Sequence, residues 1–216
     1  MTQATTMPQA ADLQHAGPDA LTNWMRERRS IRRYRPEPLP PGLIERLIDA
    51  ARFAPSAHNR QPWRFAIVQE AERKEQLAAA MGARLRADRL ADGDDREAIE
   101  RDVARSIARI GAAPAVVVAC CTLADMDVYP DARRAAAERL MAVQSTAMAV
   151  QNLLLLAHAE GLGACWMCAP LFCPDTVRGV LNLPADWQPQ ALITLGHPAA
   201  PGRVRERRAL AEIVRP

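Results

Sequence analysis

An uninterrupted helical stretch limits the possible folds of this chain more than any other feature. Residues 131–160 contain neither Gly nor Pro, and their second half is apolar on most sides, with Met148, Val150 and the run 153–156. A helix that is apolar all round is buried in a protein core or shared between copies. We therefore expect one long central helix, around which the other elements are arranged.

Shorter segments on either side of this helix alternate between helical and extended patterns. The run A-V-V-V-A-C-C at 115–121 is short and continuously apolar, which is typical of a buried central strand. Further strands are expected at 64–69, 164–169 and 190–196, and helices from residue 18, from Pro41 as a first helical position, over 72–110 with a break at 92–94, and over 174–181. This order predicts an α+β or α/β layered fold with one main sheet.

Composition narrows the class of protein. The chain has 216 residues, of which 49% are apolar and 25% charged, as in an ordinary globular domain. Five cysteines without the dense spacing of a secreted scaffold favour reduced thiols and a cytoplasmic location. We expect residues 1–18 to be a disordered tail without signal-peptide character, and 19–216 to form one domain. The most apolar run, 148–157, is too short to span a bilayer, so no membrane partner is expected.

Positive charge is concentrated near the start of this domain. Residues 28–35 read R-R-S-I-R-R-Y-R, five arginines in eight positions, whereas the formal net charge of the chain is only +3. The planar fork of guanidinium donors, together with the Ser30 hydroxyl, suits a phosphate group. A solvated basic helix end is the alternative. A nucleic-acid patch is disfavoured because no stacking aromatics are interleaved with the arginines.

A loop rich in amide side chains follows one helix later. Residues 54–63 read A-P-S-A-H-N-R-Q-P-W and precede the apolar run 65–68. Amides donate and accept hydrogen bonds at once, which suits the mixed edge of a heterocycle. A capped turn before a strand would use the same residue types. The arginine segment and the amide loop together indicate a phosphorylated heterocyclic cofactor.

These two motifs resemble the entry signature of FMN-dependent nitroreductase-like enzymes, and the resemblance extends to about residue 214. It implies a three-layer α/β/α sandwich, with one mainly antiparallel sheet of four to five strands around a long central helix. It also implies a domain-swapped homodimer with FMN at the interface. The chemistry would occur on the flavin, without a catalytic side chain or a metal. NAD(P)H or a reduced deazaflavin would reduce FMN, and a flat aromatic or deazaflavin acceptor would then be reduced in a ping-pong reaction.

The resemblance also assigns cofactor-binding residues in four segments. They are Arg28, Arg29, Ser30 and Arg32 for the phosphate and the pyrimidine edge; Pro55, Ser56, Ala57, Asn59 and Gln61 in a loop that reaches the flavin of the other protomer; Trp166, Met167, Cys168 and Ala169 beside the redox edge; and Arg205 and Arg207 near the phosphate. Arg208 is a competing register for the last pair. A plain core strand and a solvated basic tail are the alternatives for the last two segments.

The pair Cys165 and Cys168 has C-x-x-C spacing within G-L-G-A-C-W-M-C-A-P at 161–170. A single pair without further ligands at suitable spacing is weak evidence for a metal site. Residues three apart on a strand point to opposite faces of the sheet. Metal or dithiol chemistry is therefore disfavoured.

Two further motifs point to a subgroup of that family. Y-P-D-A-R at 129–133 and D-T-V-R-G-V-L-N-L-P-A-D-W at 175–187 are most similar to the C-terminal reductase domain of the bifunctional coenzyme F-420:L-glutamate ligase. This similarity implies reduction of a deazaflavin precursor, although C-A-P at 168–170 departs from the small, more polar sequence of that subgroup. A general NAD(P)H nitroreductase or quinone reductase is the alternative enzyme. A non-catalytic flavin- or deazaflavin-binding protein is the alternative from another class.

Overall fold

The computed structural model describes residues 17–215, so most of the expected N-terminal tail lies outside the described residues. The helices are α1 (Pro18–Glu27), α2 (Leu43–Ala51), α3 (Ala71–Ala91), α4 (Arg96–Gly111), α5 (Ala132–Ala159), α6 (Pro174–Leu181) and α7 (Leu210–Ile213). The strands are β1 (Trp63–Val68), β2 (Ala115–Cys121), β3 (Gly163–Met167) and β4 (Gln188–Gly196), and the 3-10 turns are η2 (Ala57–Asn59) and η3 (Ala169–Phe172).

One four-stranded sheet organises the described part of the chain. Its strand order is β1-β2-β4-β3, and every neighbouring pair is antiparallel. All seven residues of β2 are buried, as the continuous apolar run at 115–121 predicted. Val117 lies opposite Ile67 on β1 and opposite Ile193 on β4. The expected antiparallel sheet is therefore confirmed, with four strands.

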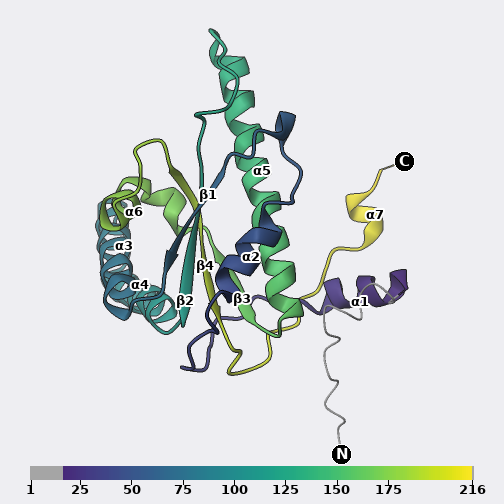
Figure 1. Ribbon diagram of the computed structural model, residues 1–216. Helices are drawn as coiled ribbons and strands as arrows, with labels where there is room; N and C mark the ends of the chain where they lie inside the picture. Colours follow the sequence, from purple (N-terminus) through teal and green to yellow (C-terminus); the bar gives the residue numbers. More distant parts are fainter. Residues whose placement is uncertain (1–16, 216) are drawn as a thin grey trace, which may run out of the picture.

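Helices cover both faces of this sheet. Figure 1 shows α2 and α5 on one face and α3, α4 and α6 on the other. Leu153 of α5 packs in the core of the first face, whereas Leu77 and Ile110 pack in the core of the second. Burying apolar surface on both sides drives this arrangement. The three-layer sandwich expected from the family resemblance is confirmed.

Helix α5 is the long helix that the sequence predicted. Its C-terminal half lies on the sheet, and its N-terminal half extends beyond the sheet (Figure 1), where Leu140 is exposed. By length and composition alone, α5 would also be a candidate membrane span, the one such helix in the described residues. Core helices of soluble proteins pass the same test, and Ala149, Leu153 and Ala157 of α5 are fully buried in the core.

The expected strand at 164–169 ends early. Strand β3 stops at Met167, so Cys168 and Ala169 lie outside it. Pro170 has a fixed φ and no N–H group, which disfavours continuing the strand. The backbone instead turns, and the amide of Leu171 donates to the carbonyl of Cys168 at 3.0 Å. The prediction that Cys168 and Ala169 belong to the strand was wrong.

The start of α2 also differs from the expectation. Pro41 is not the first helical residue, because it lies in a turn in which the amide of Leu43 donates to the carbonyl of Pro40 at 3.2 Å. Gly42 precedes the helix with a φ of 76°, a conformation that glycine adopts without steric cost. The helix then begins at Leu43.

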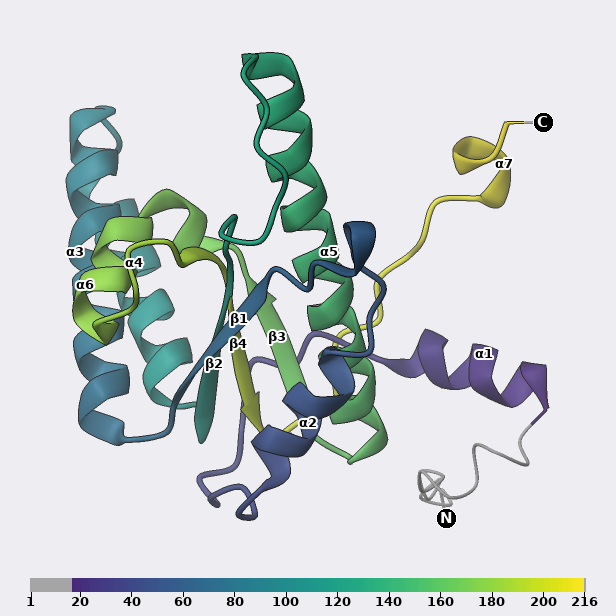
Figure 2. The same ribbon diagram turned by 45° about the horizontal axis from the view of Figure 1, so that its top comes forward.

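Both ends of the described chain project from the sandwich. Figure 2 shows α1 and the segment that carries α7 extending on the same side of the molecule. Trp24 anchors α1 by stacking on His158, with 5.5 Å between ring centroids. Leu21 and Met25 of α1 and Leu210 of α7 are exposed. Within residues 17–215, these apolar side chains have no core to pack against.

Candidate functional site

The arginine segment is fixed against the start of β3. The amide of Ile31 donates to the carbonyl of Ala164 at 2.9 Å, and Ser30 forms a parallel bridge to Ala164. Gly163 makes this approach possible, because a Cβ there would lie 2.6 Å from Cγ2 of Ile31. The segment therefore runs along the sheet edge and is not a free helix end.

The chain returns to this segment after β4. The amide of Arg35 donates to the carbonyl of His197 at 2.8 Å, and the amide of Ala199 donates to the carbonyl of Arg33 at 3.0 Å. These bonds set the start of the C-terminal segment, residues 197–207, beside residues 29–35. Two segments that lie about 170 positions apart in the sequence thus meet at one place.

A cavity of about 670 Å³ lies between these two segments. We call it the arginine cavity, because eight of its lining residues are arginines. They are Arg28, Arg29, Arg32, Arg33, Arg109, Arg203, Arg205 and Arg207. The structure therefore brings together both basic motifs that the sequence singled out, and Ser30 lines the cavity with them. Arg208, the competing register, does not line it.

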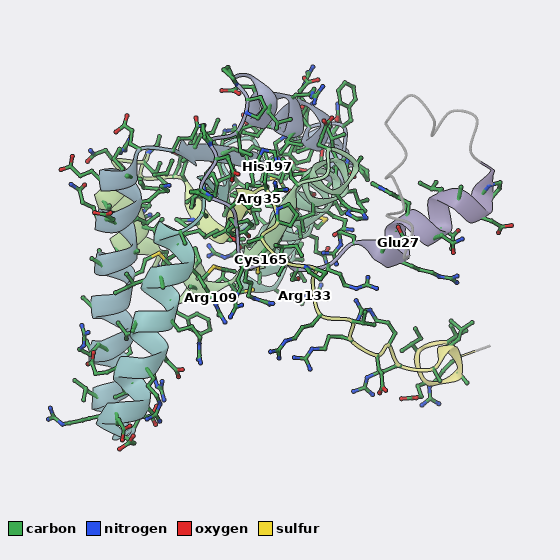
Figure 3. All side chains as sticks on the ribbon, turned by 90° about the horizontal axis from the view of Figure 1, so that it is seen from below. Glu27, Arg35, Arg109, Arg133, Cys165 and His197 are labelled. Atoms are coloured by element: carbon green, nitrogen blue, oxygen red, sulfur yellow. The ribbon has the colours of Figure 1, made fainter. Side chains whose placement is uncertain are left out.

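Three arginines of this cavity were missed by the sequence analysis. Arg33 and Arg203 sit inside the two basic motifs, so their motifs were found although they were not chosen. Arg109 comes from α4 and gave no signal, because it is one of many charged residues on that helix. Figure 3 views the molecule from below and shows Arg109 next to Cys165, between α4 and the C-terminal segment.

The charge of the arginine cavity is uncompensated within the described residues. None of its eight arginines lies within 4.0 Å of a carboxylate there, whereas twelve other arginines do. Gathering like charges is unfavourable unless an anion neutralises them. The donor set therefore fits a phosphate group, such as the phosphate of FMN.

Strand β3 leads away from the arginine cavity along an open edge. Ala164 directs its carbonyl toward Ile31 and away from β4. Backbone groups of alternate residues in an antiparallel strand face the same side, so the N–H of Trp166 also faces the open edge. A strand rises about 3.3 Å per residue, so Met167 lies about 10 Å beyond Ala164. The edge offers backbone hydrogen-bonding groups to a flat ligand whose phosphate occupies the cavity.

The residues assigned to this edge do not line the arginine cavity. Trp166, Met167 and Ala169 are half-buried, and Cys168 is exposed. The indole Nε1–H of Trp166 donates to Sγ of Cys168 at 3.0 Å, which orients the indole along the strand. These residues lie on β3 and in the turn that follows it, farther along the chain than Ala164.

The amide loop, residues 54–63, does not reach the arginine cavity of its own chain. Its residues Ser56 and Ala57 are held by two hydrogen bonds: the amide of Gln61 donates to Oγ of Ser56 at 3.1 Å, and the amide of Ala57 donates to Oγ of Ser145 on α5 at 3.3 Å. Asn59 and Gln61 have positive φ angles, as does His58. None of the loop residues, Pro55 included, lines the arginine cavity of the same chain. The structure of one chain therefore does not bring the loop and the cavity together.

A smaller cavity of about 350 Å³ adjoins the arginine cavity and shares Arg28 and Arg29 with it. His158 of α5 lines this space. Burial lowers the pKa of His158, Arg28 and Arg29 lower it further, and Glu27 opposes the shift. Burial beside the arginines thus favours the neutral form of this imidazole.

The cysteines lie mostly in the core. All five are free, and only Cys168 is exposed. Burial raises the pKa of the Cys165 thiol, although Arg32 and Arg109 lower it. In residues 17–215, no group of three or more His, Cys, Asp or Glu side chains is placed to hold a metal ion.

Comparison with known proteins was made at the level of sequence and of fold. A family model described as the nitroreductase family matches residues 25–197. A protein of Thermus thermophilus named NADH dehydrogenase is 31% identical over 212 residues, covering 87% of this chain and 91% of its own. The 5,6-dimethylbenzimidazole synthase of Rhodobacter capsulatus is 36% identical over 184 residues, covering 83% of this chain and 84% of its own.

Solved structures show the same fold. A protein of Desulfovibrio desulfuricans that is assigned as a nitroreductase and was solved with FMN has a TM-score of 0.70 and 29% identity, covering 92% of this chain and 96% of its own. The NADPH:FMN oxidoreductase of Vibrio harveyi, solved with NAD+, has a TM-score of 0.68 and 20% identity, covering 90% of this chain and 76% of its own. The second likeness concerns the fold alone.

Proposed function

This chain belongs to the nitroreductase family, and on that premise we propose that it is an FMN-dependent oxidoreductase that transfers electrons from NAD(P)H to a flat conjugated acceptor. The arginine cavity is the observation that carries this proposal, because eight arginines without a carboxylate partner in the described residues offer a donor set that suits an anionic ligand. Bound FMN would supply the hydride chemistry.

The residues of the chain would bind and orient the cofactor. Arg28, Arg29 and Ser30 from the first segment and Arg205 and Arg207 from the second would bind its phosphate. The open N–H of Trp166 would donate a hydrogen bond to the ring system at the edge of β3. No side chain is needed as nucleophile or general base, so the protein contributes position and electrostatics.

The amide loop is assigned to the site of a second copy. Ser56, Asn59 and Gln61 belong to a motif that suits a heterocycle, yet they lie outside the arginine cavity of their own chain. A homodimer in which each loop reaches the partner's flavin reconciles the two observations. The exposed apolar residues of α1 and α7 would then be covered. Light scattering on the FMN-loaded protein should give twice the chain mass of 23.7 kDa. A monomer that retains FMN would contradict this assembly.

The acceptor is a separate question. A nitroaromatic or quinone acceptor fits a general NAD(P)H nitroreductase. The narrower assignment is reduction of a deazaflavin precursor of coenzyme F-420, and the motifs at 129–133 and 175–187 support it. The five free thiols of the chain support a cytoplasmic location.

One experiment tests the proposed function. The purified protein is examined by absorbance, and any released chromophore is identified by mass. The protein is then reduced anaerobically with NADPH or NADH and mixed with a nitrofuran, a quinone or the deazaflavin precursor. We expect bound FMN, reduction by a nicotinamide donor and reoxidation by at least one acceptor. Tight flavin binding without reduction by any donor would favour the non-catalytic alternative. Failure to take up added FMN would overturn the proposal.

A matched pair of variants connects the result to the cavity. Arg207→Ala removes a lining arginine, whereas Arg208→Ala removes its exposed neighbour, which pairs with Glu212 instead. Charge-assisted hydrogen bonds contribute about 1.5–3 kcal/mol, so FMN affinity should fall about tenfold or more in the first variant. It should be unchanged in the second.

A further inference from the structure

A tyrosine lies where the two basic segments pair with each other. Tyr34 forms an antiparallel bridge to Pro198, and the amide of the next residue, Arg35, donates to the carbonyl of His197 at 2.8 Å. Figure 3 shows Arg35 and His197 close together. The backbone at Tyr34 therefore joins the arginine segment, residues 28–35, to the C-terminal segment that returns from β4.

The side chain of Tyr34 reaches back along the arginine segment. Its hydroxyl lies 2.6 Å from the carbonyl oxygen of Ile31 and 2.7 Å from Oγ1 of Thr194, a buried residue of β4. The carbonyl oxygen of Thr194 is farther away, at 3.1 Å. A phenol carries one proton, so both short bonds form when Tyr34 donates to Ile31 and the Thr194 hydroxyl donates to Tyr34. The hydroxyl thus links the arginine segment to an inner strand of the sheet.

Packing and burial keep this donor in place. Gly196 at the end of β4 leaves room for the ring, because a Cβ there would lie 2.9 Å from Cδ1 of Tyr34. Burial raises the pKa of Tyr34 above the ordinary value for a phenol. The hydroxyl is therefore protonated at neutral pH and can donate to Ile31.

The bond from Tyr34 completes the anchoring of residue 31. The amide of Ile31 donates to the carbonyl of Ala164 on β3, and the carbonyl of Ile31 accepts from Tyr34. Ser30 and Arg32 flank this anchored residue, and both line the arginine cavity. A segment that is fixed before its ligand arrives loses less conformational freedom on binding, which strengthens the binding.

We propose that Tyr34 is a positioning residue for the cofactor site. Its hydroxyl, supported by that of Thr194, holds Ser30 and Arg32 in the arrangement that receives the phosphate of FMN. Tyr34 acts through Ile31, since it does not itself line the arginine cavity. This inference rests on the proposed function, because it concerns the phosphate of that cofactor.

The test compares FMN with riboflavin, which has the same ring system and ribityl chain but no phosphate. Tyr34→Phe keeps the packed ring and removes only the hydroxyl. Fluorescence titration of apoprotein gives both dissociation constants. We expect FMN affinity to fall about fivefold, the equivalent of one neutral hydrogen bond, and riboflavin affinity to stay unchanged. The phosphorus NMR resonance of bound FMN should also shift or broaden, because the groups around the phosphate are held less firmly.

Threonine variants provide an independent pair and a control. Thr194→Ser keeps the hydroxyl that supports Tyr34 and should retain FMN affinity, whereas Thr194→Val removes it and should lower FMN affinity. Thr146→Val on α5 also removes a buried hydroxyl, one that donates to the carbonyl of Ala142 within the same helix at 2.9 Å. This control should leave both flavin affinities unchanged, even if its free energy of unfolding falls.

Other outcomes overturn the inference. Equal losses of FMN and riboflavin affinity in Tyr34→Phe would mean that the hydroxyl supports only the fold. Unchanged FMN affinity in that variant would mean that the bond to Ile31 does not shape the site. An equal loss in Thr146→Val would be a general effect of removing a buried hydroxyl.

The remaining measurements separate these results from other failures. Thermal unfolding shows whether Tyr34→Phe keeps its fold, and the two Thr194 variants decide if it does not. If riboflavin binds the unmodified chain too weakly to titrate, the phosphorus resonance decides. An unmodified chain that takes up no FMN overturns the proposed function itself, whereas FMN binding without turnover leaves the role of Tyr34 open to the same titrations.

Discussion

Gly202 packs directly against the side chain of Arg29, and a Cβ at position 202 would overlap Cβ of Arg29 and lie 3.0 Å from Cδ1 of Ile31. The contact joins the two basic segments at the wall of the arginine cavity. It depends on the absence of a side chain at 202, and it holds the C-terminal segment close enough to share a ligand with residues 28–33.

We expect Gly202→Ala to lower FMN affinity about tenfold, because separating the segments weakens charge-assisted hydrogen bonds worth about 1.5–3 kcal/mol each. Fluorescence titration of apoprotein with FMN measures the effect. Gly179→Ala is the matched control, since a Cβ at 179 on α6 would meet nothing within 4 Å. Equal FMN affinity in Gly202→Ala and the unmodified chain would show that the contact does not shape the site.

The amide loop offers a second test. Oγ of Ser56 accepts the hydrogen bond from the amide of Gln61, which holds a backbone with positive φ at residue 61. Ser56→Ala should destabilise the fold by about 1 kcal/mol, the usual contribution of one such bond. If the loop reaches a partner's flavin, FMN affinity should fall in the dimer as well. Ser106→Ala on α4, measured by the same denaturant unfolding and FMN titration, should change neither quantity.

If Ser56→Ala loses stability but keeps its FMN affinity, the loop has only a structural role. That result would favour the capped-turn alternative over a flavin contact. It would not affect the assignment of the arginine cavity.

Alkaline stability should depend on a buried thiol. Burial raises the pKa of Cys120 to about 12, above that of an unfolded cysteine at about 8.5. The unfolded chain therefore loses this proton first, so stability is complete below about pH 8.5 and falls as pH rises toward 12, by at most about 1.4 kcal/mol per pH unit. Cys120→Ala should show a flatter decline in urea unfolding between pH 8.5 and 11.

The exposed Cys168 provides the control for that measurement, because Cys168→Ala removes a thiol that is not in the core. The free energy of unfolding of Cys168→Ala should decline with pH as it does in the unmodified chain. An unchanged slope in Cys120→Ala would mean that other buried groups, such as Tyr34, dominate the alkaline limb. Burial raises the pKa of Tyr34 as well.

Lys74 has a structural role at the end of α4. Its buried Nζ donates to the carbonyl of Ala113 at 2.6 Å, and burial lowers its pKa. Lys74→Met keeps the apolar stem but removes the donor, so the free energy of unfolding should fall by about 1–3 kcal/mol, the cost of a buried carbonyl that loses its partner. Gln76→Ala, on the exposed face of α3, should stay within about 0.5 kcal/mol. Urea unfolding distinguishes the two.

Local signals determined most of the fold from the sequence. The Gly- and Pro-free stretch became α5, the run at 115–121 became β2, and the break at 92–94 separates α3 from α4. These features depend on helix breakers, apolar periodicity and chain direction, which act over a few residues. The end of β3 was missed because a strand and a 3-10 turn can have similar apolar sequences. Only Pro170, which cannot donate a backbone hydrogen bond, distinguishes the two here.

For the site, the sequence by itself determined which segments are basic and which loop carries amides. Only the tertiary structure decided that residues 28–33 and 203–207 face one cavity, that Arg109 of α4 joins them, and that the amide loop does not. The physical reason is that a basic motif consists of residues adjacent in sequence, whereas a cavity is formed by the packing of elements that are distant in sequence. The antiparallel order β1-β2-β4-β3 places β3 at an open edge, and that edge determines where the cavity lies.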